Sequence, residues 1–169
     1  HKNDYIICLT TNSFKNLLEG SPWFDKVVVD SKPKWNNIKG WRNLLFFFHK
    51  YKFKKVYDLQ TSYRSNFYFF IFFFLKNIDW SGIAYGSNYR HHNPKRRLMH
   101  TLDRQKAQLK IANIKYNNHP NWRWLANNYK NNSIIPNNKF IILVTGAAKH
   151  RLNKKWPQYR YASLIEHFS

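Results

Sequence analysis

The stretch "KKVYDLQTSYRSNFYFFIFFFLKNIDWSG", Lys54–Gly82, decides the fold class. It starts with a strand predicted over Lys54–Gln60 and runs into a strand predicted over Trp80–Gly86, with a Phe-rich helix between them. Two strands joined in this way predict a βαβ unit in a parallel sheet. The apolar run Phe67–Leu75 has nine residues, whereas a membrane-spanning helix needs about twenty. We therefore expect a crossover helix packed on the sheet, with an outward face that is a candidate for lipid contact.

The rest of the chain repeats this alternation of strands and helices. Further strands are predicted at Tyr5–Thr10, Lys26–Asp30 and Phe140–Val144, and helices over 13–20 (N-cap Ser13, stop Gly20), 38–51, 98–114, 122–129 and 156–168. The strands are continuously apolar, which is typical of parallel sheets covered on both faces. On the helix over 98–114 we expect Leu98, Leu102, Leu109 and Ala112 to face the core, and we expect the basic segment Asn88–Arg97 to be a loop.

An Asn-rich segment, Tyr116–Lys139, contains two prolines and is the best candidate for a domain boundary. The predicted organisation is a first domain over 1–133, a linker over 134–138 and the start of a second domain over 139–169. Because the sequence starts at His1 and ends inside a predicted helix, we expect it to be a fragment.

The chain is strongly basic: 29 Lys and Arg residues against 8 acidic ones give a net charge of +21. Such a surface attracts nucleic acid, anionic lipid headgroups or phosphorylated small molecules. A coding bias toward A and T explains part of the Lys content equally well, since Asn, Ile, Phe and Tyr are abundant too. The single cysteine, Cys8, excludes an internal disulfide framework and a cysteine zinc site. The histidines His91, His92, His100 and His150 lack metal-ligand spacing, so we expect loop histidines.

The segment "ILVTGAAKHRLNKKWPQYRYASLI", Ile142–Ile165, has the pattern of a phosphate site. A buried strand is followed by a small-residue turn, a pair of lysines and the start of a helix, whose N-terminal N–H groups attract anions. The candidate residues are Thr145, Gly146, Ala147, Lys154 and Lys155. Neither a GxGxxG fingerprint nor a Walker A loop is present. An ordinary βα loop with solvated lysines is the alternative interpretation.

These residues resemble glycosyltransferase family 9, the ADP-heptose:lipopolysaccharide heptosyltransferases. The "KKWP" context and its helix match at Lys154, Trp156, Pro157, Ala162, Leu164 and Ile165. Upstream, "VYDLQTSYRSNFYFF", "IDWSGIAYG" and "MHTLDRQKAQLKIANI" resemble first-domain segments of the family in the right order. The turn departs from the usual Pro-Gly form, since it reads Thr145-Gly146.

The resemblance implies a GT-B architecture, in which two Rossmann-like parallel-sheet domains face a cleft. It places Thr145, Gly146, Ala147 and Lys154, with Lys155 as a weaker candidate, at the donor phosphates, and Gln60, Arg64 and Ser65 at the acceptor. We expect the first strand, its loop with the catalytic Asp and most of the second domain to lie outside this sequence, so no catalytic base is assigned and the fragment alone is expected to be inactive.

The implied reaction is an inverting transfer of a heptose from a nucleotide-diphosphate sugar, ADP-heptose, to the lipopolysaccharide core. No metal or other cofactor is implied. The implied location is cytoplasmic, peripheral on the anionic inner face of the inner membrane. Two alternatives stay open: another GT-B enzyme with a different donor or acceptor, and a non-catalytic basic nucleic-acid-binding protein that uses "YRHHNPKRR", Tyr89–Arg97. Because no nucleic-acid-binding fold signature supports the latter, nucleic acid is not an expected partner.

Overall fold

The computed structural model describes residues 4–75, 78–116, 121–127, 136, 138–146 and 152–168. The chain divides into two compact units, unit 1 (His1–Asn128) and unit 2 (Tyr129–Ser169), which are described separately. None of the helices in the described part of the chain is long and apolar enough to cross a membrane.

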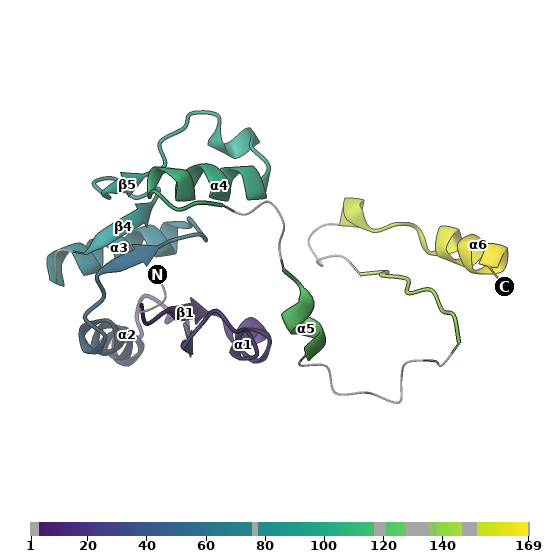
Figure 1. Ribbon diagram of the computed structural model, residues 1–169, viewed down its shortest axis with the longest axis horizontal. Coiled ribbons are helices and arrows are strands. Elements are labelled where there is room, and N and C mark those ends of the chain that lie inside the picture. The colour runs from purple at the N-terminus through teal and green to yellow at the C-terminus, as the bar shows by residue number, and fades with distance from the viewer. Residues whose placement is uncertain are drawn as a thin grey trace. The chain divides into compact units, whose positions relative to one another are not determined.

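Unit 1 is a mixed α/β structure with short parallel sheets (Figure 1). Strand β1 (Ile7–Thr10) pairs in parallel with β2 (Lys26–Val29), and α1 (Asn12–Glu19) connects them. A second parallel sheet has the order β3-β4-β5, with β3 at Lys55–Tyr57, β4 at Asp79–Gly82 and β5 at Tyr89–Arg90. The prediction of an α/β fold with parallel pairing is confirmed, but the described strands form two sheets rather than one.

Strand β5 corrects the prediction of a loop over Asn88–Arg97. Tyr89 and Arg90 pair with Ser81 and Gly82 at the end of β4. The polar and basic composition of this segment concealed the strand, because only two of its residues enter the ladder and neither is buried.

The helices of unit 1 follow the predicted order. They are α2 (Ile38–Lys50), α3 (Tyr63–Leu75), the 3-10 turn η1 (Arg96–Leu98), α4 (Thr101–Ile111) and α5 (Arg123–Asn127). The Phe-rich stretch is a crossover helix between β3 and β4, as predicted. Gly20 ends α1 as expected, but Thr11 rather than Ser13 is its N-cap, because the extended backbone that precedes the helix ends at Thr11.

The core of unit 1 is aromatic and lies between α2, α3 and β4. Its buried members are Leu44, Phe48, Tyr68, Phe69, Trp80 and Ala84. Phe69 meets the Trp80 indole edge-on, with 5.5 Å between the ring centroids. Each fully buried aromatic side chain of this size contributes about 2–3 kcal/mol of transfer free energy, so these few residues supply much of the stability of unit 1.

Helix α3 links the two sheets through polar contacts. Tyr68 Oη donates a hydrogen bond of 2.8 Å to Oδ2 of Asp30, the buried residue that follows β2. One turn earlier, Arg64 donates through both terminal nitrogens to the Pro33 carbonyl, at 3.1 and 3.2 Å. The loop after β2 is therefore anchored to a helix that belongs to the β3–β4 crossover.

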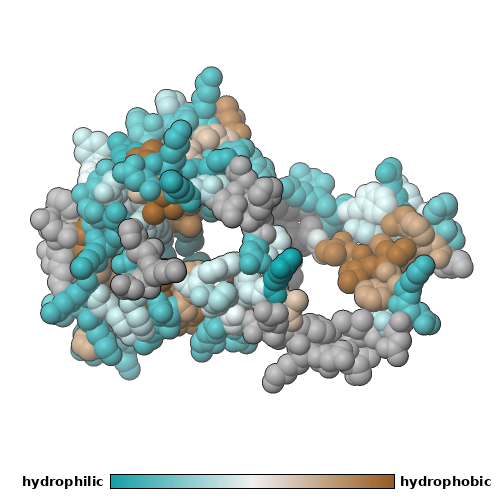
Figure 2. Space-filling view, in the orientation of Figure 1, coloured by the Kyte–Doolittle hydropathy of each residue, from teal (hydrophilic) through white to brown (hydrophobic). Residues whose placement is uncertain are grey.

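Unit 2 contains the predicted C-terminal helix, α6 (Gln158–Phe168), preceded by a 3-10 turn, η2 (Leu152–Lys154). The strand predicted at Phe140–Val144 is wrong: this segment is extended without strand pairing. A strand needs a partner for its backbone groups, and none of the described residues of unit 2 supplies one. Ile142 and Val144 are 74% and 79% exposed. Figure 2 shows a hydrophobic patch on unit 2.

We predict that Tyr68→Phe lowers the free energy of unfolding by about 1–3 kcal/mol, because it leaves a buried Asp30 oxygen without its donor. Tyr63→Phe also removes a phenolic hydroxyl from α3, but at a position that is 89% exposed. The free energy of unfolding is therefore expected to change by less than about 0.5 kcal/mol. Urea unfolding of both variants measures the difference. Equal free energies for the two variants would show that the Tyr68–Asp30 bond does not hold the sheets together.

Candidate functional site

The three residues predicted to bind the acceptor lie around the turn that joins β3 to α3. Gln60 is exposed. The Ser65 hydroxyl is buried and donates to the Ser62 carbonyl at 2.9 Å, which closes the first turn of the helix. Arg64 is engaged by the Pro33 carbonyl and lies over the rings of Trp35 and Trp41. The three residues are close because they are near in sequence, between the end of β3 and the first turn of α3. Of the three, Gln60 is the most exposed to solvent.

Asp58 follows β3 directly and is a buried carboxyl group. Its Oδ1 accepts a 2.9 Å hydrogen bond from the Thr61 N–H, while Oδ2 has no hydrogen-bond partner among the described residues. Burial raises the pKa of Asp58, and the Thr61 N–H, the Ser65 hydroxyl and the positive charge of Arg96 oppose that rise. A carboxyl group in such surroundings takes up a proton more readily than one in water.

Thr61 has a strained backbone, with a φ of 49°. This left-handed conformation is rare for a β-branched residue and costs about 1–3 kcal/mol. Its N–H is held by Asp58, and its Oγ1 accepts from Arg96 Nη2 at 3.3 Å. Strain of this kind concentrates at functional sites, which draws attention to the turn between β3 and α3.

Gln108 of α4 joins this turn to the end of β4. The side chain is completely buried, and its Nε2 donates to the carbonyls of Asp58 at 2.8 Å and Ser81 at 3.3 Å. Its Oε1 accepts from Arg96 Nη2 at 3.1 Å. One amide therefore connects β3, β4, α4 and the loop after β5.

His91 follows β5 and completes the network. It is buried, and its Nδ1 is paired with Arg96 Nη1. Burial lowers the pKa of His91, and the charges of Arg96, Arg104 and His92 lower it further. The imidazole is therefore neutral at pH 7, and because Nδ1 accepts from a guanidinium, its proton resides on Nε2.

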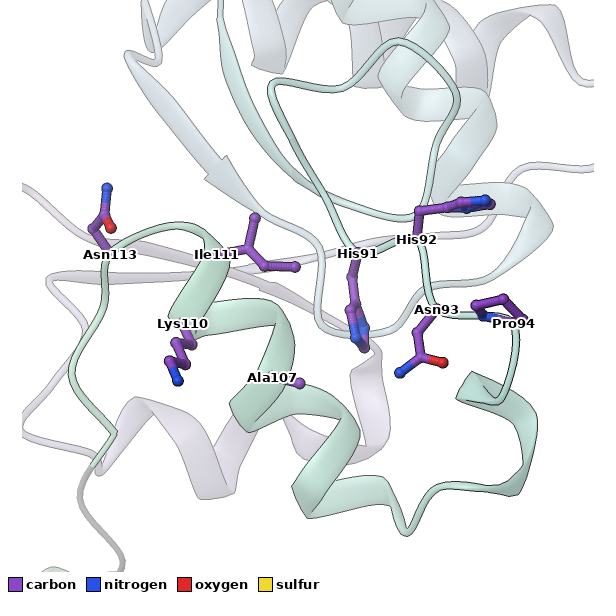
Figure 3. A pocket seen from close by; sticks show the side chains of 8 residues that line it. All are labelled: His91, His92, Asn93, Pro94, Ala107, Lys110, Ile111 and Asn113. Carbon is purple, nitrogen blue, oxygen red and sulfur yellow. The ribbon is translucent and has the colours of Figure 1, made fainter.

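An open hollow of about 650 Å³ lies beside this network. It is lined by His91, His92, Asn93, Pro94, Ala107, Lys110, Ile111 and Asn113. In Figure 3 the His91 ring lies between α4 and the loop of Asn93 and Pro94, and the Asn93 amide points toward the same space whereas His92 points away. A neutral imidazole, amide groups and the Lys110 ammonium can hydrogen-bond a polar or anionic ligand here.

In unit 2 the predicted donor-phosphate residues are on the surface. Thr145, Gly146, Lys154 and Lys155 are all exposed, and Ala147 lies outside the described residues. Tyr161 Oη of α6 donates to the Val144 carbonyl at 3.3 Å, so the residue before Thr145 lies against the first turns of that helix. No described atom lies within 4 Å of the Cβ that a side chain at Gly146 would add, so the space around it is open.

The sequence did not predict most of the polar network of unit 1, which consists of Asp58, Thr61, His91, Arg96 and Gln108. His91 lies in a loop, as expected, but its burial beside Arg96 was not foreseen. The predicted core face of the helix over 98–114 is confirmed for Ala112, which is buried, whereas Leu109 is half-buried and Leu98 and Leu102 are 87% and 55% exposed. The apolar spacing gave no place to Gln108, which is held by two hydrogen bonds to the carbonyls of Asp58 and Ser81 and by one from Arg96. The one available signal was the i, i+4 spacing of Gln108 and Ala112, a polar and a small residue.

We predict that Gln108→Met lowers the free energy of unfolding by about 2–4 kcal/mol, because it strips partners from two buried carbonyls and from Arg96. The matched change Gln105→Met on the same helix removes one long bond to the Leu59 carbonyl, at a position that is only partly buried, and is expected to cost less than about 1 kcal/mol. Chemical denaturation compares them. Similar costs at the two positions would contradict the bridging role.

The lowered pKa of His91 predicts a loss of stability in mild acid. Below its ordinary value of 6.5 the unfolded chain takes up a proton that the folded imidazole resists, so the free energy of unfolding falls as the pH drops. His91→Asn removes this contribution, and unfolding should then change less between about pH 7.5 and about pH 5.5.

The matched control is His92→Asn, an exposed neighbour. Because every other titrating group is common to all three proteins, differences between their pH slopes isolate one histidine. A slope for His91→Asn equal to that of the unchanged chain would exclude a neutral buried His91.

No three His, Cys, Asp or Glu side chains in the described ranges lie close enough to hold a metal ion. Compared with models of protein families, with curated proteins and with solved structures, the chain has no match.

Proposed function

We propose that this chain belongs to a GT-B glycosyltransferase of the heptosyltransferase type, which transfers a heptose from ADP-heptose to the lipopolysaccharide core with inversion. The observation that carries the proposal is the order of the parallel strands in unit 1. Polar residues at the carboxyl ends of those strands and the "KKWP" context in unit 2 add to it.

The strand order is compatible with a doubly wound sheet in which one position is open. A Rossmann sheet has the order 3-2-1-4-5-6, with its first strand in the middle. The described strands run β2-β1 and β3-β4-β5, all parallel. One more strand between β1 and β3 would generate the Rossmann order, and this supports a GT-B first domain.

The location of the polar network supports a ligand site in unit 1. In open α/β sheets, ligands bind outside the carboxyl ends of the strands. Asp58, Gln60 and His91 all follow such ends. An acceptor rich in hydroxyl and phosphate groups would find hydrogen-bonding side chains there and cationic groups such as Lys110 at the hollow.

Unit 2 would bind the donor. Lys154 and Lys155 lie just before α6, where their charge and the helix N-terminus would stabilise the departing diphosphate. A general base would deprotonate the acceptor hydroxyl in the same step, and none of the residues named here is assigned that role. We place the enzyme at the cytoplasmic face of the inner membrane, where its acceptor is anchored.

A nucleic-acid-binding protein is the less favoured alternative. The segment Tyr89–Arg97 suggested it, but the structure directs much of that charge inward. Arg90 donates to the Ile83 carbonyl, and Arg96 is enclosed by the polar network. A different GT-B enzyme, with another sugar or acceptor, fits the same strand order equally well.

We predict that the enzyme to which this chain belongs binds ADP and that Lys154→Ala in that enzyme weakens binding about tenfold, since a charge-assisted contact to phosphate contributes about 1.4 kcal/mol or more. Lys139→Ala, an exposed lysine of the same unit, should leave the affinity unchanged. Calorimetric titration measures both. If ADP does not bind, and single-stranded oligonucleotides bind with a steep salt dependence, the transferase proposal is wrong.

A further inference from the structure

We infer that one face of unit 1 docks on an anionic lipid bilayer. We call it the docking face and define it by four exposed apolar residues and five exposed basic ones. The apolar residues are Trp35, Ile38, Phe46 and Tyr63, and the basic residues are Lys32, Lys34, Lys39, Arg42 and Lys50. It comprises the loop after β2, the outer side of α2 and the first turn of α3. The inference deepens the membrane association in the proposed function, but its evidence is independent of sugar transfer.

Helix α2 carries apolar residues on two opposite sides. Leu44 and Phe48 are buried in the core. On the outer side, Ile38 and Phe46 are 81% and 68% exposed, and Arg42 lies between them at steps of four residues. A helix that served only to cover a sheet would have a polar outer side, so the exposed Ile38 and Phe46 point to a second contact surface.

The aromatic part of the docking face is held rigid. Trp35 is 66% exposed, yet its ring stacks on Trp41 at 5.5 Å and meets Phe67 edge-on at 5.0 Å. The Arg64 guanidinium lies 5.7 and 5.6 Å from the centroids of the two indole rings. Because Trp35 is already ordered, its insertion into another phase would cost little conformational entropy.

The charge of this region has one sign. Between Ser31 and Tyr57 the sequence contains seven Lys and one Arg, and no Asp or Glu. The lysines at 32, 34, 39 and 50 and Arg42 are exposed. Basic residues close to an anionic membrane surface attract it additively, so the docking face is complementary to phosphatidylglycerol or another acidic lipid.

The combination favours lipid over nucleic acid. Ile38 and Phe46 are exposed beside the cations Lys39 and Arg42 on the outer side of α2. Apolar groups that insert and cations that pair with acidic headgroups can therefore reach the same membrane surface. Trp and Tyr, as at positions 35 and 63, are typical of the same layer. The Phe-rich helix α3, whose outward face was the sequence-based candidate for lipid contact, buries Tyr68 and Phe69 in the core. Lipid contact by the outward face of α3 stays a prediction, and the docking face is inferred from the described side chains of α2 and its neighbours.

The test is flotation of the full chain with vesicles of phosphatidylcholine containing about one third phosphatidylglycerol, and with phosphatidylcholine alone. We expect binding to the acidic vesicles only. Ile38→Ser/Phe46→Ser and Lys39→Gln/Arg42→Gln should each reduce the partition coefficient about tenfold or more. The matched controls Leu98→Ser/Leu102→Ser and Lys95→Gln/Arg97→Gln alter exposed residues outside the docking face and should bind as the unchanged chain does.

Circular dichroism confirms that each variant is folded before its binding is compared. Absence of binding to acidic vesicles, or equal losses in the control variants, would overturn the inference. Oligonucleotide binding that Lys39→Gln/Arg42→Gln abolishes, without vesicle binding, would assign the face to nucleic acid instead. ADP titration of the same variants separates the two proposals: intact ADP binding without vesicle binding refutes docking alone, and the reverse result refutes the donor site alone.

Discussion

The hydrogen bond between Tyr68 and Asp30 joins the two sheets of unit 1, which form no backbone ladder with each other among the described strands. Burial, above all, raises the pKa of Tyr68 to about 12, so its hydroxyl keeps its proton and remains a donor at neutral pH. The same carboxyl group accepts from the Lys32 N–H at 2.8 Å and so sets the start of the loop after β2. Arg64 then holds that loop by a hydrogen bond to the Pro33 carbonyl. Trp35, two residues further along the loop, is thereby placed where its ring stacks on Trp41. The docking face thus depends on a contact made in the interior.

At the other end of the unit a single guanidinium has the corresponding role. Arg96 reaches Thr61, Gln108 and His91, which belong to three separate segments. A lysine has three donors but lacks the planar fork, whose two terminal nitrogens lie apart and so reach partners in different segments. Because Arg96 fixes the turn after β3 and the loop after β5 together, the hollow beside His91 has a wall that is already ordered, as a ligand site requires. The strained Thr61 is kept in place by the same network.

The sequence predicted the features that depend on local pattern. The Phe-rich run between two strand patterns predicted α3 and its parallel neighbours. Nine apolar residues are too few to span a membrane, and a helix between two parallel strands must bury an apolar side on the sheet. Features that depend on distant partners were not predictable from the sequence.

Phe140–Val144 has the composition of a strand but forms none, because strand pairing needs a second segment as partner. On the buried side of α4, Ala112 was predicted but Gln108 was not, because apolar periodicity gives no weight to an amide. The partners of Gln108 are carbonyls 27 and 50 residues earlier in the chain. Of the site, the turn at Gln60 was predictable, and the Arg96–His91 pair was not.

The separation between β1 and β3 also bears on how the chain behaves in concentrated solution. Each of these strands has one edge that no described strand occupies, and such edges recruit strands from other molecules. Lys54 and Lys55 lie at the start of β3 and disfavour association there by charge repulsion. Strand β1, with the sequence Ile-Cys-Leu-Thr, carries no charge. We therefore expect molecules of this chain to associate through the free edge of β1 at high concentration and then to precipitate. A single lysine introduced beside that strand would reduce this association by charge repulsion.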